Sequence, residues 1–103
     1  MHPYCVIIPT TCAPERAPLL ERAVASVDCS RTELVVVANG PRVDASLLER
    51  LRTLGASTHR LDIGNVSLAR YEGVARSSAP LFCFLDDDDE FLPGGLAERA
   101  ARF

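Results

Sequence analysis

Residues 81–89 read LFCFLDDDD, an apolar run that passes directly into four aspartates. The apolar part has the length and composition of a strand buried in a sheet. In open α/β sheets, ligands bind beyond the carboxyl ends of the strands. We therefore expect a buried strand at Leu81–Leu85, with the acidic residues in a loop suited to a ligand.

Other short β-branched runs precede this segment. Strands are expected at Tyr4–Pro9, at Glu33–Ala38, which the turn sequence Asn39-Gly40-Pro41 ends, and, with a weaker pattern, at Ser57–Leu61. The runs alternate with stretches of helical periodicity, which is the pattern of an α/β protein with a parallel sheet.

Helical patterns fill the segments between these strands. Helices are expected from Pro18 onward, from about Asp44 to Leu54, from Val66 to Ser77, and from Pro93-Gly94-Gly95 to the C-terminus. The second has the apolar face Leu47, Leu48, Leu51 and Leu54 with Gly55 as its cap, and Asn65 or Ser67 caps the third. The expected fold is a single α/β domain over residues 1–103, a three-layer Rossmann-like parallel sheet of about four strands with flanking helices.

Composition excludes several classes of protein. The chain has 103 residues and a net charge of -3, and its arginines are scattered, so no nucleic-acid partner is expected. The apolar run Tyr4–Pro9 is too short to cross a bilayer, and no secretory signal is present, so we expect a cytoplasmic protein, peripheral at the membrane at most. The four cysteines have no ligand spacing and are expected to be buried free thiols rather than a disulfide or zinc site.

The four aspartates point to a metal ion. Adjacent carboxylates repel one another, and a bound cation removes that cost. If the segment stays extended, Asp86 and Asp88 point to the same side and form a hard oxygen site for magnesium or manganese, which would take further ligands from a substrate's phosphates. A solvated acidic loop without a ligand is the simpler alternative, and a calcium loop is disfavoured because the EF-hand spacing is absent.

Polar residues follow three of the expected strands. Thr10-Thr11 follows the first, Asn39-Gly40 the second and Asp86–Asp89 the fourth. The carboxyl ends of parallel strands lie at one edge of a sheet, so these residues are expected to form one site.

Five segments together resemble family 2 glycosyltransferases in order and spacing over about residues 4–97. They are Ile7–Thr10 (IIPT), Val35–Gly40 (VVVANG), Gly64–Arg70 (GNVSLAR), Phe84–Asp89 (FLDDDD) and Leu92-Pro93. The resemblance implies a GT-A fold, a Mn²⁺ or Mg²⁺ cofactor, and transfer of a sugar from a UDP-, GDP- or dTDP-sugar to an acceptor.

The resemblance also assigns roles on the nucleotide side. It places Thr10 in the loop that receives the base, Asn39 where members commonly have an Asp that binds base or ribose, and Arg70 near the nucleotide. Thr11-Cys12 and Ala38-Asn39 depart from the family's aromatic-Asn and acidic pairs, which leaves the base open. Asn39 as a turn former and Arg70 as a surface arginine are the alternative interpretations.

Within the acidic run, Asp86 and Asp88 fit the outer positions of the family's Asp-x-Asp motif. The resemblance makes Asp88 the metal ligand and Asp86 a ribose contact or second metal contact. Asp87 is placed with the nucleotide-sugar contacts, and Asp89 assists.

We expect this chain to be the donor-binding front part of a metal-dependent glycosyltransferase. The acceptor half and its Asp or Glu general base are expected beyond Phe103, so no catalytic residue is assigned here and little turnover is expected from the chain alone. An unpaired sheet edge would favour a homodimer. The alternative is a non-catalytic nucleotide-binding or protein-interaction module of the same fold. A nucleotidyltransferase lacks support because the loop after the first strand has no glycine or lysine, and no GxGxxG indicates a dinucleotide oxidoreductase.

Overall fold

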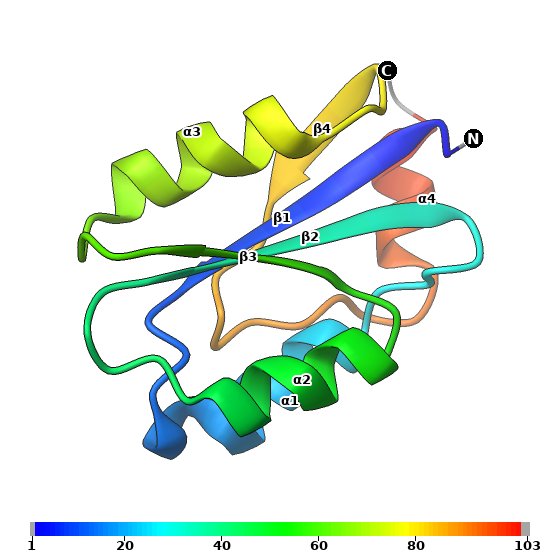
Figure 1. Ribbon diagram of the computed structural model, residues 1–103. Coiled ribbons are helices and arrows are strands. Elements are labelled where there is room, and N and C mark those ends of the chain that lie inside the picture. The colour runs from blue at the N-terminus through cyan, green and yellow to red at the C-terminus, as the bar shows by residue number, and fades with distance from the viewer. Residues whose placement is uncertain (1, 102–103) are drawn as a thin grey trace.

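The structure, a computed structural model, describes residues 2–101, which form a four-stranded parallel sheet between two layers of helices (Figure 1). The strands are β1 (Tyr4–Thr10), β2 (Thr32–Asn39), β3 (Ser57–Leu61) and β4 (Leu81–Phe84). Their order in the sheet is β3-β2-β1-β4, and each neighbouring pair is parallel. The predicted three-layer α/β fold is confirmed.

The helices are η1 (Pro14–Arg16), α1 (Ala17–Ala25), α2 (Ala45–Thr53), α3 (Val66–Arg76) and α4 (Gly95–Ala100). Side chains cap two of them: Asp44 accepts from the amides of Ser46 and Leu47, and Asn65, one of the two caps predicted for the third helix, accepts from the amide of Leu68. The last two residues of the predicted C-terminal helix lie outside the described residues. No helix between residues 2 and 101 is long and apolar enough to cross a membrane.

Alternate residues of the central strands supply two separate cores. Val6 and Ile8 pack in one core with residues of α1 and α2, whereas Ile7 packs in the other with Ala69 of α3. Figure 1 shows α1 and α2 on one face of the sheet and α3 on the other. Gly73 lets α3 approach β1 closely, because a Cβ at this position would lie 2.3 Å from Cγ2 of Ile7. The sheet therefore has both faces covered at its centre, as a parallel sheet requires.

The prediction that Leu54 belongs to the apolar face of α2 is wrong. Leu47 and Leu51 are fully buried, but Leu54 is 48% exposed. The helix ends at Thr53, and the chain turns away at Gly55, whose φ of +107° is accessible to glycine at little cost. Leu54 therefore lies past the last helical turn and off the buried stripe.

The prediction of a buried fourth strand is also wrong. Leu81, Phe82 and Phe84 are 41%, 49% and 38% exposed. The cause is the position of β4, which pairs with β1 alone in the described part of the chain and so forms an edge of the sheet. The homodimer expected from an open edge stays a prediction.

Candidate functional site

The order in which strands are added to the sheet changes direction between β1 and β4, although all the strands are parallel. The chain runs outward through β2 and β3, and then crosses back to place β4 on the other side of β1. At the carboxyl ends of two such strands the connecting segments diverge and leave a crevice. Here the pairing ends where the amide of Leu85 donates to the carbonyl of Ile7 at 3.0 Å, and Pro9 has no N–H to extend it.

A cleft of about 390 Å³ lies at this point. β1 and the segment after it, α3 and the acidic run all contribute to its walls. The residues that line it are Pro9, Thr10, Thr11, Arg16, Val66, Asp86, Asp87 and Asp88. The structure thus brings the end of the first strand and the acidic run together, as the sequence predicted.

The acidic run is a turn rather than an extended segment. The amide of Asp89 donates to the carbonyl of Asp86 at 3.0 Å, which places Asp87 and Asp88 at the centre of the turn. The assumption of alternating side chains is therefore wrong, although Asp86 and Asp88 still come together. Carboxylate oxygens of Asp86, Asp88 and Asp89 lie within 4.8 Å of one another, and all three residues are exposed.

Asp87 alone among the four aspartates is buried, with 9% of its surface exposed. One carboxylate oxygen accepts from the hydroxyl of Thr10 at 2.6 Å and from Nε of Arg16 at 3.2 Å. The other oxygen pairs with the terminal guanidinium nitrogen of Arg16. Both carboxylate oxygens are thus held inside the protein, and the hydrogen bond from Arg16 to Asp87 raises the pKa of the guanidinium.

Thr10 and Asn39 are linked to the same network. The Thr10 hydroxyl also accepts from the amide of Cys12 at 2.9 Å, and the Asn39 side-chain amide donates to the Thr10 carbonyl at 2.9 Å. Thr10 is 3% exposed and Asn39 is 2% exposed. These bonds fix the loop after β1 against the end of β2. The roles of Thr10 and Asn39 toward a nucleotide stay predictions.

Arg70, on the first turns of α3, faces the acidic turn. Its guanidinium lies 3.6 Å from a carboxylate oxygen of Asp86 and stands over the ring of Phe84, with 5.5 Å to the ring centroid. Nε of Arg70 is buried and has no hydrogen-bond partner within residues 2–101. The side chain thus holds positive charge beside Asp86 of the acidic turn. Arg70 is not among the residues that line the cleft, and its role toward a nucleotide stays a prediction.

Two residues of the cleft were missed by the sequence analysis. Arg16 reaches Asp87 from the short helix η1, and Val66 reaches the cleft from the start of α3. No local pattern distinguishes Arg16 from the other arginines of the chain. The proline pair Pro14 and Pro18, which brackets η1, is the available signal that the chain folds back after β1.

Cys12 provides no nucleophile beside this cleft. It is fully buried, and burial raises its pKa to about 11, so the thiol stays protonated at neutral pH. The four cysteines are free. The prediction that they are buried is confirmed for Cys5 and Cys12 and is wrong for Cys29 and Cys83, which are partly buried.

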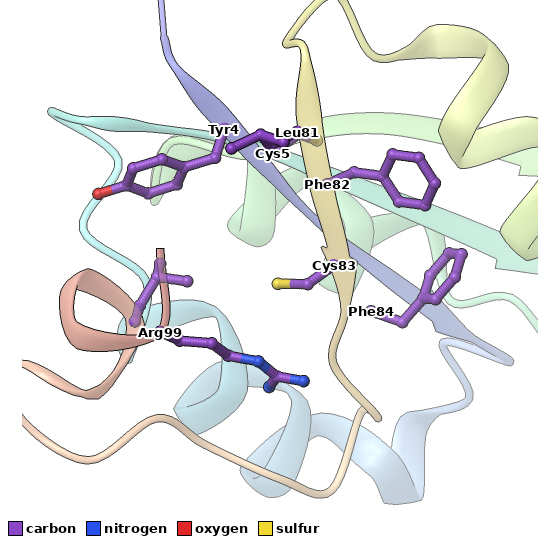
Figure 2. A pocket seen from close by; sticks show the side chains of 8 residues that line it. Tyr4, Cys5, Leu81, Phe82, Cys83, Phe84 and Arg99 are labelled. Carbon is purple, nitrogen blue, oxygen red and sulfur yellow. The ribbon is translucent and has the colours of Figure 1, made fainter. Parts of the chain in front are cut away.

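A second hollow, also of about 390 Å³, lies along the outer edge of β4 (Figure 2). Tyr4, Cys83 and Arg99 approach it from one side of the strand, and the rings of Phe82 and Phe84 extend to the other side. It has a mainly apolar lining and contains none of the residues predicted for a site. Chemistry that needs several polar groups is therefore better placed at the acidic cleft.

The outward aspartates suit a hard divalent cation. Two oxygens on opposite sides of one magnesium ion are about 4 Å apart, so small rotations of exposed carboxylates would bring Asp86, Asp88 and Asp89 onto one ion. An ion held by few carboxylates keeps coordination positions for the phosphates of a ligand. Both the donor atoms and their spacing fit Mg²⁺ or Mn²⁺.

Comparisons with known proteins bear on this arrangement. The model of the family described as Glycosyl transferase family 2 matches residues 5–103. No curated protein matches the chain.

Solved structures of TarS from S. aureus share the fold. TarS 1-349 has a TM-score of 0.77 and 24% identity, covering 98% of this chain and 32% of that chain. The same protein in complex with UDP-GlcNAc gives 0.77 and 24%, covering 98% and 30%, and a further TarS structure gives 0.75 and 22%, covering 98% and 19%. This chain spans about a third or less of the length of these structures.

Proposed function

This chain belongs to glycosyl transferase family 2, and we propose that it binds the nucleotide diphosphate part of a sugar donor together with Mg²⁺ or Mn²⁺. The observation that carries the proposal is the convergence of Asp86, Asp88 and Asp89 at the crevice between β1 and β4. In open α/β sheets this is the position where nucleotide ligands bind. TarS, similar in fold, has been solved in complex with UDP-GlcNAc and with UDP, so a uridine donor is the first to test.

We assign the metal to Asp88 and Asp86, with Asp89 beside them. When bound, the ion supplies positive charge against the diphosphate, which departs as the leaving group of sugar transfer. Arg70 stands 3.6 Å from Asp86 and adds a second cation on the α3 side of the cleft. A diphosphate would thus lie between two positive groups.

The base and ribose are assigned to the loop after β1 and the end of β2. Asn39 donates to the Thr10 carbonyl and the Thr10 hydroxyl donates to Asp87, and these two bonds shape this region. Because both oxygens of Asp87 are occupied by Thr10 and Arg16, we propose that Asp87 contributes to nucleotide binding through the shape of the turn.

We further propose that these residues form the donor-binding portion of the enzyme. Transfer also requires an acceptor held in line and a base that removes its proton. The similar TarS structures are about three times as long as this chain or longer, which leaves room for those parts elsewhere in a protein of this kind. We accordingly expect the 103-residue chain to bind a donor with little turnover.

Calorimetric titration of the chain with UDP, GDP and dTDP, each with and without MnCl₂, tests the proposal. We expect one nucleotide to bind in a manganese-dependent way, and Asp88→Asn to weaken that binding at least about tenfold, because it removes a metal ligand. Glu49→Gln is the matched control, since Glu49 is an exposed acid on α2, away from the cleft, and pairs with neighbouring Arg52.

Absence of binding by every nucleotide, with and without the metal, would contradict the proposal. Binding that ignores both manganese and Asp88→Asn would instead favour a metal-independent module that has kept the fold.

A further inference from the structure

We propose that Arg16 is a positioning residue for the metal-binding turn: it holds Asp87 inward and so directs Asp86, Asp88 and Asp89 outward. The part of this inference that concerns metal rests on the proposed function. The part that concerns the turn rests on the contacts of Asp87 alone.

Arg16 and Thr10 together occupy both carboxylate oxygens of Asp87. Arg16 uses two guanidinium nitrogens on the two carboxylate oxygens, the bidentate arrangement that an arginine, but not a lysine, can make. The Thr10 hydroxyl adds a third bond at 2.6 Å. An aspartate with both oxygens occupied and 9% of its surface exposed has no free oxygen to offer a metal.

The position of Asp87 in the turn determines where its neighbours point. Asp87 and Asp88 occupy its two central positions, closed by the bond from the Asp89 amide to the Asp86 carbonyl. When one side chain of a turn is held inward, the directions of the neighbouring side chains in that turn are fixed as well. With Asp87 fixed inward, the exposed oxygens of Asp86, Asp88 and Asp89 lie together within 4.8 Å.

Two arginines neutralise part of the negative charge of the turn. The turn carries four carboxylates, and the guanidiniums of Arg16 and Arg70 each pair with one of them, on Asp87 and Asp86 respectively. About two negative charges remain, which is equal and opposite to the charge of one divalent cation. Arg16 therefore removes the charge of the one aspartate that faces inward and leaves the outward ones for the ion.

The structure of the network explains why Arg16 acts from so far along the chain. Arg16 is 71 positions from Asp87 in sequence, and it is brought there by η1, directly after the loop that Thr10 and Cys12 hold. The same network joins the ends of β1, β2 and β4, so a change at Arg16 is expected to alter the loops of the cleft while the central sheet is unaffected.

The test uses the whole chain and two readouts. The first is the affinity for MnCl₂ alone, measured by calorimetry, which we expect Arg16→Ala to weaken about tenfold, the effect usual for residues that orient metal ligands. The second is hydrogen exchange of the Asp89 amide in metal-free buffer, which we expect to become at least about tenfold faster while amides of β1 keep their rates.

Two further variants separate positioning from general stability. Arg16→Lys keeps the charge and loses the bidentate geometry, so it should recover part of both effects and confirm a fold that stays intact. Arg42→Ala is the matched control, because Arg42 makes an exposed ion pair with Glu15 of the same short helix. It should leave both readouts unchanged.

The inference fails if Arg16→Ala leaves the exchange of the Asp89 amide at the wild-type rate. It also fails if faster exchange is matched by equal changes throughout β1, since that would indicate loss of stability alone. If the unaltered chain binds manganese neither alone nor together with a nucleotide, the proposed metal site fails, while selective exchange of the Asp89 amide would still support the positioning of the turn by Arg16.

Discussion

β2 and β4 are both short apolar runs that lead into polar residues at the same edge of the sheet, but their environments differ. β2 has neighbours on both sides, and Leu34, Val35, Val36 and Val37 are at most 2% exposed. β4 has one neighbour in residues 2–101, and Phe82 remains 49% exposed. Burial of a strand therefore depends on its place in the sheet order as much as on its composition.

The loops that follow these strands differ in the same way. At the end of β2, Asn39 is 2% exposed and is bonded to Thr10. After β4, Asp86, Asp88 and Asp89 are exposed around a single buried anchor, Asp87. The central strands supply a rigid base, and the edge strand presents the groups that can meet a ligand. Three measurements test this contrast.

The largest expected difference concerns thiol reactivity. Cys5 on β1 is fully buried and its pKa is raised to about 12 by burial, whereas Cys83 on β4 is half-buried. Alkylation of Cys5 requires unfolding of the central sheet, which costs about 5 kcal/mol or more in a domain of this size. At pH 8 we expect iodoacetamide to modify Cys83 about a thousandfold faster than Cys5, as followed by peptide mass spectrometry.

The same thiols in the urea-unfolded chain are the control, where both should react at similar rates. Native rates within about threefold of each other would contradict the view that β1 is better protected than β4.

The sequence was sufficient to predict the central strands, β1 and β2. In β1 and β2, strand propensity, length and burial all favour the same structure, so their bounds were predicted to within one residue at each end. The alternating order of strands and helices then predicted a parallel sheet with the polar residues at one edge. These features follow from local patterns and from general rules of topology.

The exposure of β4 and the inward orientation of Asp87 could not be predicted from the sequence, for two physical reasons. The exposure of β4 depends on which strand lies beside it, and this is a property of the whole sheet. The inward orientation of Asp87 depends on Arg16, which is distant in sequence and has no local signature. Four identical aspartates therefore gave no indication that one is an anchor and three are exposed.

The second measurement compares one substitution in both strands. Leu34→Ala on β2 removes a side chain that is 2% exposed, and we expect it to lower the free energy of unfolding by about 3 kcal/mol. Leu81→Ala on β4 removes one that is 41% exposed, with an expected loss below about 1 kcal/mol. Urea unfolding followed by circular dichroism gives both values. Equal losses would show that β4 contributes to the core as β2 does.

The smallest expected effect concerns the open edge itself. An edge strand with apolar side chains and no charge of its own is a template for pairing with another strand, which is the basis of the predicted homodimer. Phe82→Lys places a charge on this edge, and we expect it to weaken self-association at least about tenfold, equivalent to about 1.4 kcal/mol. Sedimentation velocity across a range of concentrations measures the effect. Leu54→Lys is the control, since Leu54 is 48% exposed at the end of α2, outside the β4 edge. If both lysine variants weaken association equally, or if neither does, pairing through β4 is not how copies of the chain associate, and the exposed aromatic side chains of β4 need another explanation.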